Sequence, residues 1–97
     1  MGREEYRVGQ TIQIDLTMND DITGAGTVQV RYRKPSGTAT SAAATVVNAD
    51  IGWIRYVLPA ASVDEYGDWS VWAYAVRSDG TVDIGDTLIM RVNREGY

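Results

Sequence analysis

The sequence predicts an all-β fold in which two antiparallel sheets, of about seven strands in total, pack face to face. Short runs of residues alternate between apolar and polar side chains, which is typical of half-buried strands. Turns containing Gly, Pro, Asn or Asp separate these runs. The apolar residues are mainly Val, Ile, Ala, Trp and Tyr, with no Phe, and β-branched and aromatic residues suit a pleated surface.

The first half of the chain contains three expected strands. Residues 10–17 alternate most clearly, and residues 27–33 repeat the pattern after a polar, glycine-containing connection. Residues 34–37 read Lys-Pro-Ser-Gly, a turn in which Pro presets φ and Gly accepts the closing conformation. Residues 38–48 contain an alanine run, but their β-branched residues and missing helix caps favour one strand.

The second half contains three more expected strands. Residues 53–58 alternate and stop at Pro59, and residues 60–66 form a crossover that we expect to include a helical turn at 61–65. Residues 68–77 are the long central strand. A tight turn at Ser78-Asp79-Gly80 follows, and residues 87–93 close the sheet.

Length and charge restrict the organisation and the partners. The 97 residues correspond to a single domain spanning 1–97, with the charged ends 1–7 and 93–97 expected to be terminal arms. Nine basic and thirteen acidic residues give a net charge of −4, which disfavours nucleic acid and anionic membranes as partners. The absence of Cys and of an apolar leader predicts synthesis and folding in a reducing cytoplasm.

The residue types argue against catalysis. The chain has no His and no Cys, which excludes imidazole-based and thiolate-based nucleophilic systems. Asp64 and Glu65 are adjacent acids, but neighbouring side chains on an extended chain diverge. We therefore expect no enzymatic activity and no cofactor.

One acidic cluster has residues that could surround calcium. It consists of Asp79, Asp83 and Asp86, with glycines nearby that free backbone carbonyls. The spacing is not that of the helix-loop-helix calcium motif, and Asp-Gly is common hairpin chemistry. We favour a solvated hairpin here, and the same interpretation for residues 19–21.

The long strand is apolar on both faces. If Trp69, Val71, Ala73 and Ala75 face inward, the alternation of side chains places Trp72, Tyr74 and Val76 on the opposite face. That outer face is either covered by the protein's own arms and loops or docks on a partner, since Trp and Tyr are favoured anchors.

Two further groups complete the candidate partner-binding set. Arg31 and Arg33 belong to it because they could stack on aromatic rings or pair with a partner's acids, although they could equally be solvated charges that prevent aggregation. Trp53 is the third aromatic candidate. The predicted set is Trp72, Tyr74, Val76, Trp53, Arg31 and Arg33.

Two motifs carry family resemblances. Glu65-x-Gly67-x-Trp69-x-Val71 resembles the acid-x-Gly/Ala-x-Tyr-x-Cys signature at the corner of immunoglobulin-like domains. Trp69 stands in place of the corner tyrosine, so the resemblance implies a corner hydrogen bond from the indole N–H. Val71 stands in place of the cysteine, so no disulfide is expected.

A wider resemblance covers nearly the whole chain. The motifs at residues 9–12, 32–38, 52–56, 67–69 and 90–92 are similar to those of small immunoglobulin-like proteins in virions of tailed bacteriophages. The resemblance implies a structural protein of the capsid surface, neck or tail, made in the host cytoplasm and attached in many copies to other virion subunits. One alternative is a carbohydrate-binding or host-surface adhesion module, in which Trp72, Tyr74 and Trp53 stack on sugar rings. Another is a calcium-stapled adhesion domain.

Overall fold

The computed structural model describes residues 5–94. This part of the chain forms nine strands and two short 3-10 helices. Their bounds are β1 (Glu5–Arg7), β2 (Ile12–Thr17), β3 (Thr27–Arg33), β4 (Ala39–Ala43), β5 (Thr45–Asn48), η1 (Ala49–Ile51), β6 (Trp53–Leu58), η2 (Ala60–Ser62), β7 (Gly67–Val76), β8 (Val82–Ile84) and β9 (Leu88–Asn93).

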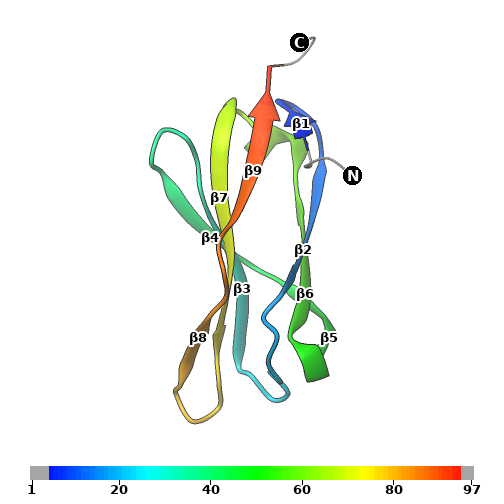
Figure 1. The fold of residues 1–97 in the computed structure, drawn as a ribbon, viewed down its shortest axis with the longest axis vertical. Helices are drawn as coiled ribbons and strands as arrows, with labels where there is room; N and C mark the ends of the chain where they lie inside the picture. Colours follow the sequence, from blue (N-terminus) through cyan, green and yellow to red (C-terminus); the bar gives the residue numbers. More distant parts are fainter. Residues whose placement is uncertain (1–4, 95–97) are drawn as a thin grey trace.

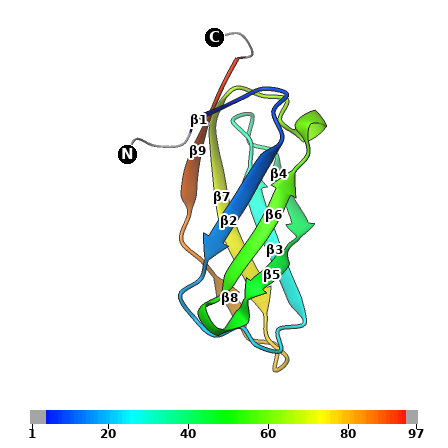
Figure 2. The ribbon, with the colours of Figure 1, turned by 90° about the vertical axis from the view of Figure 1, so that its right-hand side faces the viewer.

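The strands form two packed sheets. The larger sheet has the order β1-β9-β7-β3-β4, with β8 also paired to β7, and the smaller sheet has the order β2-β6-β5. Figure 1 shows the two layers from the side, and Figure 2 shows the smaller sheet in front of the larger one. This division of strands is that of an immunoglobulin-like sandwich, as the sequence predicts. All strand pairs described are antiparallel except β1–β9, which is parallel.

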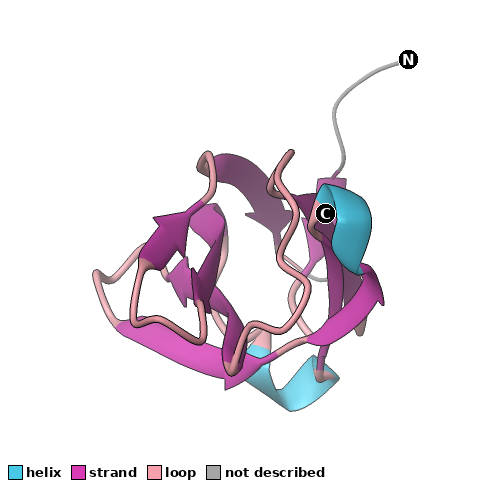
Figure 3. Ribbon diagram, turned by 90° about the horizontal axis from the view of Figure 1, so that it is seen from below, coloured by secondary structure: helices cyan, strands magenta, loops and turns pink. Residues whose placement is uncertain are grey.

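The strands surround a common interior (Figure 3), and buried apolar side chains from both inner faces form the core there. In β2 every second residue is buried. Its apolar side chains point into the core and its polar side chains point to solvent, as their alternation in the sequence indicates. The buried apolar residues are Ile12, Ile14, Leu16, Ile22, Val30, Tyr32, Ile54, Leu58, Val63, Trp69, Val71, Ala73, Ala75, Met90 and Val92. They form one cluster, and no polar side chain of the described residues is buried with them.

Strand β7 lies at the centre of the larger sheet, and its side chains point inward and outward in the predicted order. Its inward residues Trp69, Val71, Ala73 and Ala75 are at most 2% exposed, whereas the residues between them are half-buried. One edge of β7 pairs with β3 over residues 70–76, and the other edge pairs with β9 over residues 67–71 and with β8 over residues 74–76.

The prediction of one strand at residues 38–48 requires correction. The chain leaves the larger sheet after β4, passes through Ala44 and enters the smaller sheet as β5. The alanine run lacks the apolar–polar alternation that would hold a strand in one sheet, so its small side chains permit the switch between layers.

The predicted arms also require correction. Glu5–Arg7 form β1, which pairs with the end of β9, and Asn93 is the last residue of β9. The other residues of the two predicted arms, apart from Arg94, lie outside the described residues. A three-residue strand is too short to show a recognisable alternation of apolar and polar residues. For this reason neither β1 nor β8 was predicted from the sequence.

The crossover after β6 contains a single 3-10 turn, η2, which begins one residue before the predicted helical turn. Within residues 5–94, no helix is long and apolar enough to span a membrane.

Candidate functional site

The corner that precedes β7 is built around Trp69. Its indole N–H donates a hydrogen bond to the backbone carbonyl of Glu65 at 3.0 Å, so the expected corner hydrogen bond is present. The ring is fully buried and stacks against Tyr32, with 5.7 Å between the ring centroids. A tryptophan thus fixes the corner and fills the core at the same time.

The turn between β3 and β4 docks on this corner through polar contacts. The Nζ atom of Lys34 lies 2.7 Å from the Asp64 carboxylate. The backbone N–H and the hydroxyl of Ser36 each donate a 3.0 Å hydrogen bond to the Glu65 carboxylate. The hydrogen bond from Lys34 lowers the pKa of Asp64, and in return raises the pKa of Lys34. The two acids of the corner are therefore engaged in holding the turn.

Gly67 completes this contact because a larger residue would not fit. Its φ of +128° is unfavourable for side chains, and a Cβ atom would lie 2.9 Å from the Cγ atom of Pro35. The corner motif at residues 65–71 and the turn at residues 34–37, both of which contribute to the family resemblances, are thus packed against each other.

The exposed surface of the larger sheet is the main candidate site. Trp72, Tyr74 and Val76 point outward from β7 as predicted, and they are half-buried by their neighbours. Directly opposite residues on paired strands share a face, so Ile84 lies beside Tyr74 and Val82 beside Val76. We call the following residues the outer face: Arg31, Arg33, Trp72, Tyr74, Val76, Val82, Ile84 and Ile89.

The outer face carries large apolar side chains in contact with solvent. Ile84 is 65% exposed, Ile89 is 58% exposed and Val82 is 48% exposed. These three residues are not in the set predicted from the sequence. The Asp79-Gly80 turn indicates a hairpin after β7, but the alternation Val82-Asp83-Ile84 that follows it is too short to identify β8 by itself.

Two arginines border the aromatic residues. The guanidinium carbon of Arg31 lies 3.5 Å from the centroid of the Tyr74 ring, and its Nε atom donates to the Gln29 side chain at 3.2 Å. Arg33 donates to the backbone carbonyl of Gly37 at 2.9 Å. Within residues 5–94, neither arginine has a carboxylate at ion-pair distance. Arg31 therefore stacks on a ring, and both arginines keep charge available to a partner.

A shallow depression of about 370 Å³ lies between these arginines and β4. It is lined by Arg31, Arg33, Trp72 and the small residues Ala39, Thr40 and Ser41. The small side chains of β4 leave the guanidinium groups accessible from the edge of the sheet.

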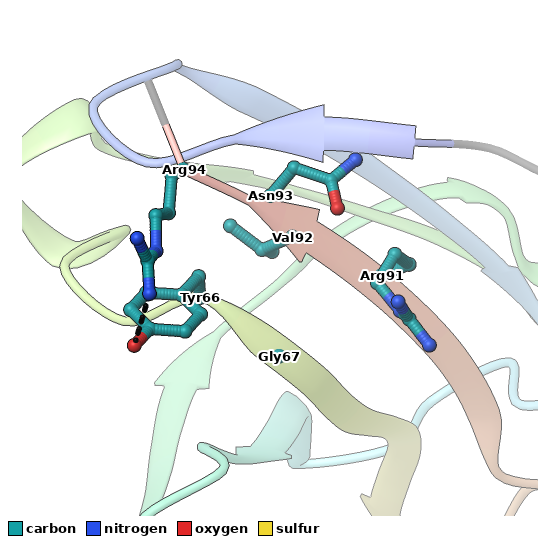
Figure 4. A pocket seen from close by; sticks show the side chains of 6 residues that line it. All are labelled: Tyr66, Gly67, Arg91, Val92, Asn93 and Arg94. Carbon is teal, nitrogen blue, oxygen red and sulfur yellow. Dashed lines mark hydrogen bonds between the residues drawn. The ribbon is translucent and has the colours of Figure 1, made fainter. Parts of the chain in front are cut away.

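A second hollow, of about 270 Å³, lies beside the end of β9 (Figure 4). Its two arginines are already engaged. Arg94 donates to the Tyr66 hydroxyl at 3.1 Å, as Figure 4 shows, and Arg91 pairs with Asp68 at 2.7 Å. This hollow has no carboxylate or other general base in its lining and offers no catalytic arrangement.

Trp53 does not belong to the outer face. It lies on β6, on the outward side of the smaller sheet, where its indole N–H donates to Asp15 at 3.2 Å. Arg55 donates to the same carboxylate at 2.8 Å. Burial raises the pKa of Asp15, but the hydrogen bonds from Arg55, Gln13 and Trp53 outweigh it and lower the pKa overall. Five of the six predicted residues share one face, and the sixth is on the opposite side of the sandwich.

Two of the three candidate calcium ligands, Asp79 and Asp83, form local bonds. Asp83 pairs with Arg77 at 2.6 Å, and Asp79 accepts a 2.9 Å hydrogen bond from the Thr81 backbone. Asp20 also pairs with Arg77, at 2.8 Å. Across residues 5–94, no three acidic residues lie together as metal ligands would.

A scan against protein-family models finds no match for this chain, and a search of curated proteins finds none either.

Proposed function

We propose that this chain is a non-enzymatic structural protein of a tailed-bacteriophage virion that attaches to capsid, neck or tail subunits through the outer face. The observation that carries the proposal is the apolar surface centred on Trp72 and Tyr74, which exposes Val82, Ile84 and Ile89 on adjacent strands. The virion itself is proposed from the resemblance of the sequence motifs.

The composition of the outer face supports attachment to protein. Aromatic residues and arginine are the residue types that contribute most to binding energy at interfaces, and contiguous exposed apolar surface commonly marks an interaction site. Here two aromatic rings lie at the centre, with aliphatic side chains on one side and Arg31 and Arg33 on the other. The whole chain has a net charge of −4, whereas the outer face contains two arginines and no acidic residue, so this face differs in charge from the molecule as a whole.

The arrangement of the rings supports a protein partner over a glycan. A sugar-binding platform needs ring faces that are open to solvent and lie on one surface. The Tyr74 ring is instead covered by the Arg31 guanidinium, and Trp53 lies on the other sheet. Asp64, Glu65 and Asp83 are held in ion pairs or hydrogen bonds with neighbouring residues, which likewise supports a non-enzymatic role.

The proposal is tested on purified phage particles. We expect mass spectrometry to find this chain in many copies per particle and imaging to place it on the capsid surface, neck or tail. Trp72→Ala should reduce the number of attached copies, whereas Trp53→Ala, on the opposite face, should leave it unchanged. Absence of the chain from particles would refute the virion role, and equal attachment of both variants would refute the choice of face.

A further inference from the structure

Strand β4 presents a free backbone edge to solvent. It is the last strand of the larger sheet and pairs only with β3. Ala44 N–H donates to the Val28 carbonyl, and Lys34 N–H donates to the Thr38 carbonyl, so the even-numbered residues of this segment face β3. Backbone groups alternate along an antiparallel strand, so the N–H and C=O groups of Ala39, Ser41 and Ala43 point away from the sheet.

This edge lacks the features that normally prevent strands from pairing with another chain. Edge strands are usually protected by charges, Pro, bulges or very short length. The other edge strands in the described part of the chain each have such a feature: β1 has three residues with charges at both ends, β2 carries Asp15, β5 has a register irregularity after Val46, and β8 has three residues with Asp83 at its centre. Strand β4 reads Ala-Thr-Ser-Ala-Ala and has none of these features.

The charge beside this edge selects the kind of strand that fits. Arg31 lies opposite Ser41 and Arg33 lies opposite Ala39, and both arginines border the depression of about 370 Å³. A strand added beyond β4 would lie about 4.8 Å from it, with every second side chain on the same side of the sheet as the arginines. Those positions could place carboxylates within reach of the guanidinium groups, across the small side chains of Ala39 and Ser41.

We infer that β4 accepts an extended segment of a partner protein as an added strand, with acidic side chains at alternate positions that pair with Arg31 and Arg33. The inference rests on the proposed attachment function and specifies part of its partner. A second copy of this chain fits less well. The outward residues of β4 are Ala39, Ser41 and Ala43, so pairing of two β4 strands would bring no carboxylate from β4 to the arginines.

The direct test uses a synthetic extended peptide as the probe, with Glu alternating with Val or Thr and both ends blocked. Titration of the peptide into the labelled protein should shift the amide resonances of residues 39–43 and protect the N–H groups of Ala39, Ser41 and Ala43 from exchange. The matched peptide with Gln in place of Glu should bind about tenfold more weakly, because it loses charge-assisted hydrogen bonds.

Two substitutions at Ser41 separate the contribution of its backbone N–H to peptide binding from the contribution of its side chain. Ser41→Pro removes an N–H that faces solvent and leaves the ladder to β3 in place, a position where edge strands tolerate Pro. It should abolish peptide binding, whereas Ser41→Ala should bind as the parent does. Arg31→Gln combined with Arg33→Gln should remove the preference for Glu over Gln. Thermal melting verifies that each variant is folded. If Ser41→Pro does not fold, the arginine variants still test the inference through the preference for the Glu peptide over the Gln peptide.

The outcomes distinguish this inference from the attachment function. Peptide binding that survives in folded Ser41→Pro, shifts confined to the region of Trp72, or no binding of the Glu peptide would overturn strand addition. Dimerisation that Ser41→Pro abolishes, without peptide binding, would assign the edge to a second copy. If Ser41→Pro protein attaches to particles as the parent does while Trp72→Ala protein does not, the attachment face stands and the added strand is refuted.

Discussion

The indole N–H of Trp69 and the carbonyl of Glu65 are joined by a 3.0 Å hydrogen bond across the entrance to β7. The bond ties the crossover to the strand whose two faces define the interior and the outer face. Trp69 itself is fully buried against Tyr32. The position of Trp72 on the outside therefore depends on Trp69 being held on the inside.

Trp69→Phe should destabilise the fold while keeping an aromatic ring in the core. The change removes the donor to the part-buried Glu65 carbonyl, a loss of about 0.5–1.5 kcal/mol, and the smaller ring leaves space in the core, which adds to the cost. Trp72→Phe is the matched control and should change the free energy of unfolding by less than about 0.5 kcal/mol. Chemical denaturation measures both, and equal effects would show that the two faces of β7 are assigned incorrectly.

Gly67→Ala should cost more stability than the same change at Gly80. Both glycines have positive φ, +128° and +90°, so both substitutions carry backbone strain of about 1–3 kcal/mol. Only at Gly67 would the new Cβ also meet the Pro35 ring, at 2.9 Å. Thermal melting of the two variants compares them, and an equal loss at both sites would contradict the close packing of the turn on the corner.

The Lys34–Asp64 pair should make stability fall at acid pH. The hydrogen bond from Lys34 lowers the pKa of Asp64 in the folded state. Its contribution is therefore present above the ordinary aspartate pKa of about 3.9 and is lost as the pH falls through the lowered value. The raised pKa of Lys34 has the opposite sense: its contribution is present below the ordinary lysine pKa and is lost as the pH rises through the raised value.

Asp64→Asn should accordingly reduce stability at neutral pH and flatten its decline during acid titration, measured by denaturant unfolding across pH. Asp86→Asn removes a carboxylate that forms no ion pair within the described residues, and serves as the control. An unchanged acid profile in Asp64→Asn would show that the pair does not contribute in solution.

Ile84→Glu should block attachment without unfolding the protein. Ile84 is 65% exposed beside Tyr74, so a charge there remains solvated in the free protein but would be buried in an apolar interface. Val57→Glu is the matched control, since Val57 is 48% exposed on the smaller sheet. Counting attached copies on particles separates them, and equal attachment would exclude Ile84 from the interface.

The sequence predicts those parts of the fold in which side chains alternate. Strand β7 and its two faces follow directly from the order of Trp69, Val71, Trp72 and Tyr74, because the period of a strand is two residues. The switch of sheets at Ala44 could not be predicted, because adjacent alanines carry no information about register.

Only part of the candidate site was predicted, because the alternation of side chains was again the information that the sequence provides. Parity identifies which residues leave β7 on its outer side, but it does not show which strands lie beside it. The exposure of Ile84 and the placement of Trp53 on the opposite sheet depend on pairings between distant segments. Single-strand patterns contain no such information.

The most direct test of the account is oxidative footprinting of the three tryptophans in the free protein and on particles. We predict that Trp69 is protected in both states, that Trp53 reacts in both states, and that Trp72 reacts in the free protein and becomes protected on the particle. Protection of Trp53 in place of Trp72 on attachment, or equal reactivity of Trp72 in both states, would contradict the claim that the outer face of the larger sheet binds the virion.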